Sequence, residues 1–137
     1  ILCQDFFQYV VHRIEHKYND LYKFTHYRHH IHIKPIMFNA FDGSIGDTMF
    51  MIIIPLYTTS QVFHVNVWTY MTFGTIYANW LTLIHSEYVH PWDPYFEMIG
   101  FGTAKNHHVH HKTFKCNYGH LFMYWDYLFG TYKSVEF

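Results

Sequence analysis

A long stretch in the middle of the chain carries no charged side chain, and it limits the folds that are possible. No Asp, Glu, Lys or Arg occurs from Thr48 to Ile84. The length of this stretch roughly matches two bilayer crossings of about 20 residues each. The polar run from Thr58 to Gln61 offers a turn between them. We therefore expect an all-α fold built on a membrane-embedded helical hairpin over about 48–84.

Basic residues flank this hairpin on both sides and predict its orientation. They run from Arg13 to Lys34 before it and from Lys105 to Lys133 after it. By the positive-inside rule, both flanks then lie in the cytosol. The first crossing is the weaker one because it is short and contains Pro55, so a partial crossing is its alternative. A pair of buried core helices outside a membrane is the alternative for the whole hairpin.

The segments outside the hairpin are also predicted to be mainly helical. Residues 5–31 contain no Pro or Gly, whereas 39–46 has the composition of a loop. A short helix is expected over 104–114, and an aromatic C-terminal helix after the turn at 117–119. With 137 residues the chain is expected to form one domain. It begins with Ile rather than Met, and we interpret it as a fragment that lacks N-terminal transmembrane helices.

Histidine is strongly over-represented in this composition. The chain has 14 His but only 9 Lys and Arg together. Imidazole is the commonest neutral metal ligand, so this excess points to metal binding. The formal net charge of -1 argues against nucleic acid as a partner, because a phosphate-binding face needs clustered Lys and Arg. Two distant cysteines form neither a CxxC pair nor a disulfide framework, which suits a reduced, cytosol-facing setting.

Most of the histidines fall into three groups with helical spacing. These groups are an HxxxH at His12 and His16, an HxxHH at His26, His29 and His30, and a second HxxHH at His107, His110 and His111. Positions i, i+3 and i+4 share one side of a helix, so each group is expected to direct its imidazoles at one site. A hairpin would return both flanks to the same membrane face, where the three groups can meet.

The number of converging imidazoles predicts two metal ions. A structural zinc takes four ligands and usually recruits Cys, so these histidines exceed one ion. Four or five nitrogens per ion leave an open position, which iron needs to bind and activate O₂. His85 and His90, which follow the second crossing, are further candidate ligands. Four other histidines are interpreted as ordinary core or surface residues: His32, His64, His108 and His120.

The same residues bear on two other possible functions. The HxxxH lacks a Glu directly after its first histidine, which argues against a zinc hydrolase of the HExxH type. A non-enzymatic, histidine-rich metal-binding membrane protein is the alternative from a different functional class. Such a protein would not account for a charge-free segment between the histidine groups.

The motifs and their order resemble the fatty acid hydroxylase and sterol desaturase superfamily of membrane histidine-box di-iron oxygenases. The likeness runs from Val11 to Lys133 through HRIEH, LYKFTHYRHH, HHVHH and NYGHLFMYWDYLFGTYK. Residues 65–69 followed by His85 resemble the sterol desaturase branch. Residues 85–92 are more similar to sterol 4-methyl oxidases, so the branch is mixed.

This resemblance implies one catalytic domain of the fatty acid hydroxylase type over 1–137, with a cytosolic histidine-rich helical cap on the hairpin. It implies an enzyme that hydroxylates or desaturates a membrane lipid, with a sterol as first choice and a fatty acyl or sphingolipid substrate as alternative. The expected cofactors are two iron ions, with O₂ as co-substrate and electrons from NAD(P)H through a cytochrome b-type carrier or reductase. The expected location is integral to a membrane, the endoplasmic reticulum in a eukaryote, with the active site facing the cytosol.

Carried over by position, the resemblance also implies a set of metal ligands. His90 stays open, because some members have HxxxH there and this chain spaces its pair five apart. The nine implied ligands are His12, His16, His26, His29, His30, His85, His107, His110 and His111.

Overall fold

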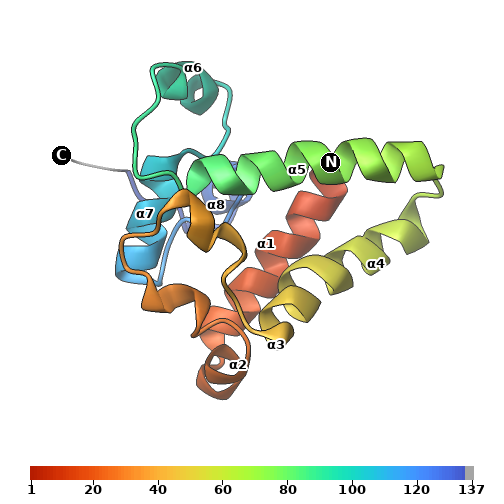
Figure 1. Ribbon diagram of the computed structural model, residues 1–137, viewed down its shortest axis with the longest axis horizontal. Coiled ribbons are helices and arrows are strands. Elements are labelled where there is room, and N and C mark those ends of the chain that lie inside the picture. The colour runs from red at the N-terminus through yellow and green to blue at the C-terminus, as the bar shows by residue number, and fades with distance from the viewer. Residues whose placement is uncertain (135–137) are drawn as a thin grey trace.

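The computed structural model describes residues 1–134, which fold mainly into helices (Figure 1). The elements are α1 (Leu2–Lys17), α2 (Asn19–Phe24), η1 (His29–Ile31), η2 (Met37–Phe41), α3 (Ile45–Thr48), η3 (Met49–Ile53), α4 (Ile54–Val62), α5 (Val67–Ile84), α6 (Asp93–Met98), α7 (Ala104–Thr113) and α8 (Tyr124–Leu128). Within these residues, β pairing is confined to an isolated bridge between Phe101 and Phe122. The expected all-α class is confirmed for the part of the chain that the structure describes.

Elements α3, η3 and α4 follow one another without a break and form one continuous helical segment. The middle of this segment, η3, is π-helical. Ser44 begins the segment, because its hydroxyl accepts a hydrogen bond from the Asp47 backbone N–H at 3.0 Å. Pro55 has no N–H to offer the carbonyl of Met51, and its ring crowds that carbonyl. The wider π turn at Met49–Ile53 accommodates this mismatch.

The turn between the two long helical segments lies later than the sequence predicted. Helix α4 continues through 58–61, where the polar run suggested a turn. The Thr58 hydroxyl donates to the Ile54 carbonyl at 2.8 Å, so this polar side chain is satisfied inside the helix. The chain reverses at 63–66 instead, and the side chain of Asn66 then accepts the Thr69 backbone N–H at 3.0 Å to cap α5.

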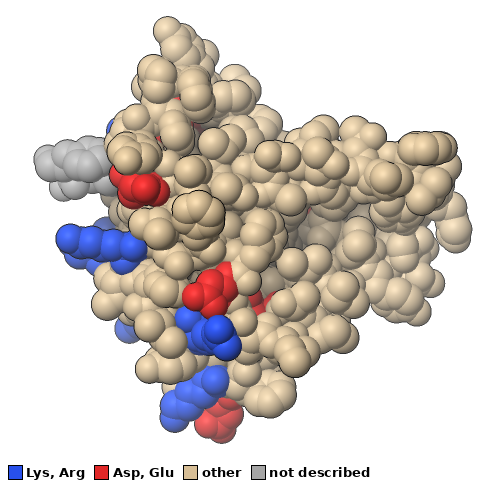
Figure 2. Space-filling view, in the orientation of Figure 1, with Lys and Arg blue, Asp and Glu red and all other residues tan. Residues whose placement is uncertain are grey.

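Helices α4 and α5 diverge from this turn and form an arm, defined here as residues 54–84 (Figure 1). Figure 2 shows charged side chains over the body of the molecule and none on the visible face of the arm. Several large apolar side chains of the arm are exposed, among them Trp68 at 71% and Tyr57 at 66%. Among the described helices, none is long and apolar enough to cross a membrane. The membrane hairpin therefore stays a prediction.

The inner end of the arm joins a small apolar core and a much more polar interior. Tyr77, Leu81 and Ile84 of α5 pack on Leu121 in this core. Helix α1 packs on α4, and α7 packs on α5. Most of the remaining buried side chains are polar, and many of them are histidines. Buried polar groups are costly unless they are paired, so this interior needs a specific account.

The C-terminal segment is mainly loop, whereas the sequence suggested an aromatic helix. Of the described residues after Phe114, only Tyr124–Leu128 is helical. The Asp126 carboxylate accepts the backbone N–H of Tyr118 at 2.9 Å and of Gly119 at 2.7 Å, which fixes the preceding loop. A Cβ on Gly119 would lie 2.3 Å from the Phe122 carbonyl oxygen, so glycine is required at this close approach.

Candidate metal centre

The nine histidines implied as ligands converge in two groups. The five-histidine cluster is His12, His16, His26, His30 and His110, and the four-histidine cluster is His29, His85, His107 and His111. Within each cluster, every side chain offers a nitrogen within 4.8 Å of the others. The clusters adjoin, since the rings of His30 and His111 have centroids 4.5 Å apart.

Helical spacing decides which histidines of a motif stay together. His12 and His16 lie one turn apart on α1 and share the five-histidine cluster. His26 and His30, also four apart, share that cluster, while His29 turns to the other. The expectation that all three imidazoles of this HxxHH would face one side of a helix is therefore wrong. The segment is built of turns and the short η1, and residues at i+3 and i+4 differ by about 100° in direction.

The third motif also contributes to both clusters, but two of its histidines join the four-histidine cluster and one joins the five-histidine cluster. On α7, His107 and His111 belong to the four-histidine cluster, and His110 belongs to the five-histidine cluster. His85 completes the four-histidine cluster from the C-terminal end of α5, where its Nδ1 bonds to the Leu81 carbonyl at 2.7 Å. Each HxxHH thus contributes to both clusters and ties them together.

Backbone carbonyls fix the tautomer of several rings. Nδ1 of His12 donates to the Tyr118 carbonyl at 2.8 Å, and Nδ1 of His110 donates to the Cys116 carbonyl at 2.8 Å. Nδ1 of His111 donates to the His32 carbonyl at 2.9 Å. A carbonyl oxygen can only accept, so the proton lies on Nδ1 and the inward Nε2 of the neutral ring carries a lone pair.

These lone pairs point at one another, which is unfavourable without a cation between them. Nε2 of His107 lies 2.9 Å from Nε2 of His85 and 3.0 Å from Nε2 of His111. His85 and His111 have no proton on Nε2, and His107 can donate to only one of them. At least one of these contacts therefore cannot be a hydrogen bond. These nitrogen atoms are therefore suited to binding a metal ion. A hydrogen bond from Nδ1 to a backbone carbonyl, with Nε2 left for the metal, is typical of histidine ligands.

Burial keeps these imidazoles neutral. It is the main cause that lowers the pKa of His16 and of His85 to about 4. The pKa values of the other seven are lowered in the same direction: His12, His26, His29, His30, His107, His110 and His111. Neutral rings can bind a metal near neutral pH without first releasing a proton.

Two carboxylates beside the five-histidine cluster were assigned no role from the sequence. Oδ1 of Asp47 lies 2.5 Å from Nδ1 of His26, on the side of the ring away from the cluster centre. Glu15 is buried nearby and, with these two residues, forms a third group of candidate ligands. Burial raises the pKa of Asp47 to about 7 and that of Glu15 to about 8. A carboxylate behind a ligand imidazole orients the ring and raises its basicity.

Of the five remaining histidines, the structure places one beside the clusters and the other four outside them. His120, interpreted from sequence as an ordinary residue, is only 4% exposed, and its ring stacks on that of His12 with centroids 4.8 Å apart. Its Nδ1 has no hydrogen-bond partner within residues 1–134. His90 instead stacks on Trp92 outside both clusters. Three others also lie outside the clusters: His32, His64 and His108.

A cavity of about 150 Å³ opens beside both clusters. It is lined by His26 and His29, one from each cluster, and by His120. Gln8 of α1 also lines it, and the buried Oε1 of this side chain lacks a partner among the described residues. Leu81 adds an apolar wall. The site therefore combines a dense set of neutral nitrogen donors with space for a small molecule or for one end of a larger one.

Comparison with known proteins gives a consistent set of relatives. The family model described as fatty acid hydroxylase matches residues 1–131. An alternative squalene epoxidase of Phaeodactylum tricornutum is 56% identical over 98% of this chain and 39% of its own length. A methylsterol monooxygenase of Aspergillus fumigatus is 30% identical over 98% of this chain and 46% of its own length. A Delta(7)-sterol-C5(6)-desaturase of Nicotiana tabacum is 26% identical over 98% of this chain and 48% of its own length.

The chain thus spans half or less of the length of these curated relatives. No solved structure gives a significant match to it.

Proposed function

Because the chain belongs to the fatty acid hydroxylase family, we propose that it is the catalytic part of an O₂-dependent di-iron oxidoreductase acting on an apolar lipid. The observation that carries this proposal is the pair of buried histidine clusters, whose ring nitrogens converge next to a cavity. Two iron ions held by nitrogen ligands with open positions would supply the activation of O₂.

In this proposal the protein holds and orients the ligands and excludes water. The carbonyls of Tyr118 and Cys116 hold Nδ1 of His12 and of His110, so each ring presents Nε2 to the same cluster. Asp47 does the same for His26 and adds negative charge behind the ring when it is ionised. The buried setting keeps bulk water from competing for the reactive positions.

We propose epoxidation of squalene as the specific reaction. The support is the 56% identity to the alternative squalene epoxidase, against 30% for the methylsterol monooxygenase. In an epoxidation, one oxygen atom of O₂ enters a carbon–carbon double bond and the other leaves as water, which consumes two electrons and two protons. We propose that NAD(P)H supplies these electrons through a cytochrome b-type carrier.

Hydroxylation or desaturation of a sterol is the second candidate. The names of the Aspergillus and tobacco relatives favour it, and it was the first choice from the sequence motifs. A fatty acyl or sphingolipid substrate has no comparable support among these relatives. A non-enzymatic metal-binding role is disfavoured, because the family match covers residues 1–131 and its relatives are named for oxidations of lipids.

We propose that the arm, residues 54–84, inserts into a bilayer with the histidine clusters on the cytosolic side. The arm carries no charge, and it exposes apolar side chains such as Trp68, Met71 and Phe63. The charged side chains lie over the body of the molecule (Figure 2). In a eukaryotic cell this membrane would be the endoplasmic reticulum.

The proposal is tested with the chain purified anaerobically in detergent and loaded with ferrous iron. We expect two irons per chain and, with squalene, a reductant and ¹⁸O₂, a squalene epoxide that carries one labelled oxygen. A 4-methyl sterol in parallel distinguishes the second candidate, which predicts a labelled alcohol there and no squalene product. Loosely bound zinc, or iron without O₂ consumption for either lipid, would overturn the assignment as an oxygenase. The variant H29A should abolish turnover.

A further inference from the structure

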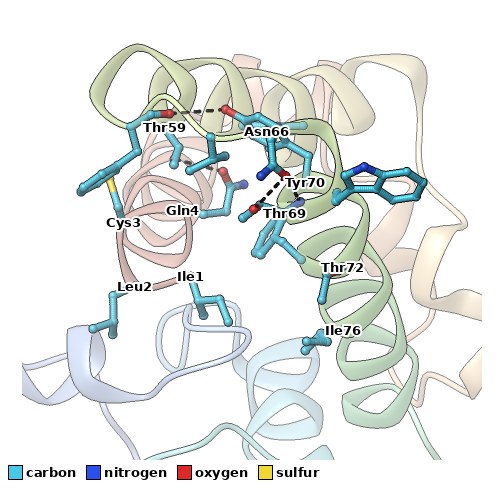
Figure 3. A pocket seen from close by; sticks show the side chains of 15 residues that line it. Ile1, Leu2, Cys3, Gln4, Thr59, Asn66, Thr69, Tyr70, Thr72 and Ile76 are labelled. Atoms are coloured by element: carbon cyan, nitrogen blue, oxygen red, sulfur yellow. Dashed lines mark hydrogen bonds between the residues drawn. The ribbon is translucent and has the colours of Figure 1, made fainter.

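Three cavities lie in series between the tip of the arm and the histidine clusters. The outer cavity, about 890 Å³, lies between the start of α1, the end of α4 and the start of α5 (Figure 3). A middle cavity of about 150 Å³ shares with it Gln4, Leu56, Tyr70 and Phe73. The inner cavity beside the clusters shares with the middle one Phe41, Met51, Ile52 and Leu81. The outer and inner cavities share no lining residue, so the middle cavity lies between them.

One face of α5 follows this series. Tyr70, Gly74, Tyr77 and Leu81 line the middle cavity and recur at intervals of three or four residues, as one side of a helix requires. Four residues beyond Leu81, the same face reaches His85 of the four-histidine cluster. At about 1.5 Å of rise per residue, the face from Tyr70 to His85 is roughly 22 Å long. The series is therefore suited to an elongated ligand.

The walls favour an apolar ligand. No charged side chain lines the outer or the middle cavity. The polar groups there are largely engaged with each other: the Thr59 hydroxyl donates to Oε1 of Gln4 at 3.1 Å, and Asn66 caps α5 (Figure 3). Buried polar atoms without partners among the described residues occur toward the inner end, on Tyr77 of the middle cavity and on Gln8 and His120 of the inner cavity.

The middle cavity offers a reason for the glycine at position 74. This glycine lies in the interior of α5, where glycine costs about 1 kcal/mol relative to alanine. Its backbone is not in the left-handed region, so the helix itself does not require glycine. A Cβ built at this position would meet no atom within 4 Å, so close packing does not require it either. Gly74 is exposed and lines the middle cavity, so the open space beside its α-carbon borders that cavity.

We propose that the three cavities form one binding passage for an elongated apolar lipid, with its reacting end at the histidines and Gly74 setting its width. The statement that the lipid reacts at the histidines rests on the proposed function. The binding of a lipid in the passage does not depend on that function, so binding and function can be tested separately.

The first test compares G74F with T75F. Thr75 is the next residue of α5, it is exposed, and it lines none of the three cavities, so it receives the same ring outside the passage. Both variants should bind as much iron as the unchanged chain. G74F should lower squalene turnover at least about tenfold, whereas T75F should leave it unchanged. If G74F fails to bind iron, A78L, which adds bulk to the same cavity, replaces it.

The second test measures binding without turnover. A long hydrocarbon that carries a diazirine is photoactivated on the iron-loaded chain, and labelled peptides are identified by mass spectrometry. Labelling should fall on residues around the middle cavity, such as Phe73 and Met51, should be competed by squalene, and should be lost in G74F but kept in T75F.

The outcomes separate the passage from the proposed function. Loss of labelling in G74F, together with an unchanged chain that oxidises neither squalene nor sterol, supports the passage and refutes the function. Normal turnover and labelling in G74F refute the passage and leave the function standing. Equal losses in G74F and T75F also refute the passage, because the effect would then not depend on the cavity.

Discussion

Nδ1 of His12 donates a hydrogen bond to the backbone carbonyl of Tyr118 at 2.8 Å, which joins positions 106 residues apart in the chain. The loop that bears this carbonyl thereby sets the orientation of a candidate ligand imidazole on α1. Asp126 in turn holds the loop, since its carboxylate accepts the backbone N–H groups of Tyr118 and Gly119. The NYG and WD motifs of the sequence therefore meet directly behind the five-histidine cluster.

This relationship predicts that Asp126 controls metal affinity without binding metal itself. In D126N, an amide replaces one carboxylate oxygen and opposes a backbone N–H, so the loop and His12 lose their fixed position. Metal affinity of the five-histidine cluster should fall about 10- to 100-fold, as measured by chelator competition. The control is D93N, because Asp93 is also buried and accepts a backbone N–H, from His90 at 3.0 Å, away from the clusters. Equal effects of the two variants would contradict the prediction.

The two clusters are expected to empty separately. H16A removes a side chain of the five-histidine cluster, and H107A removes one of the four-histidine cluster. Each variant should retain one metal ion per chain where the unchanged protein holds two, as measured by elemental analysis after gel filtration. H32A, which changes a side chain outside both clusters, should retain two. A single variant that loses both ions would show that the clusters form one indivisible site.

Asp47 should strengthen metal binding through His26. The variant D47N keeps an oxygen acceptor for Nδ1 of His26 but removes the charge, and D47A removes both. Metal affinity should therefore decrease in the order unchanged chain, D47N, D47A, with about 10- to 100-fold for the full loss. D42N is the matched control, because Asp42 pairs with Arg28 and His32 at the surface. An unchanged affinity in D47A would remove Asp47 from the metal centre.

His120 is expected to affect turnover more than metal content. Its ring lies against His12 and lines the inner cavity, but the side chain belongs to neither cluster. H120F retains a flat ring for stacking and removes both nitrogens from the cavity. This variant should hold two irons and show a lower kcat, whereas the sequence interpretation of an ordinary residue predicts no change. Iron content and steady-state kinetics, measured on the same sample, decide between them.

The metal-free chain should lose stability as the pH falls. Burial lowers the folded-state pKa of His16 and His85 from an ordinary value near 6.5 to about 4. Between these values the unfolded chain binds protons that the folded chain excludes. The unfolding free energy therefore decreases with falling pH by ~1.4 kcal/mol per unit for each such histidine. Four buried carboxylates with raised pKa values act in the opposite sense, but the nine histidines outnumber them. These carboxylates are Asp5, Glu15, Asp47 and Asp126.

Denaturant unfolding of the metal-free chain from pH 7.5 down to 4.5 measures this slope. Iron-loaded protein is the comparison, because bound metal occupies the nitrogens and should preserve stability to lower pH. A metal-free chain whose stability does not change over this range would contradict the neutral, buried state of the histidines.

The helical class and the nine histidines of the two clusters follow from local properties of the chain. Helical periodicity is local: it places His12 and His16, or His107 and His111, on one face whatever surrounds them. The charge-free segment likewise marked the arm, because charge is a property of composition. The turn was misplaced to 58–61, since side-chain hydroxyls of a polar run can be satisfied by the helix's own carbonyls.

Tertiary packing then determines which cluster each of the nine histidines joins. Spacing along the chain points His29 and His110 away from their motif partners, and the packing of segments far apart in the chain determines which other histidines they meet. The same long-range placement put Asp47 behind His26 and brought His120 to the inner cavity. No sequence period reports such contacts, because they depend on how α1, α5 and α7 pack rather than on how each one winds.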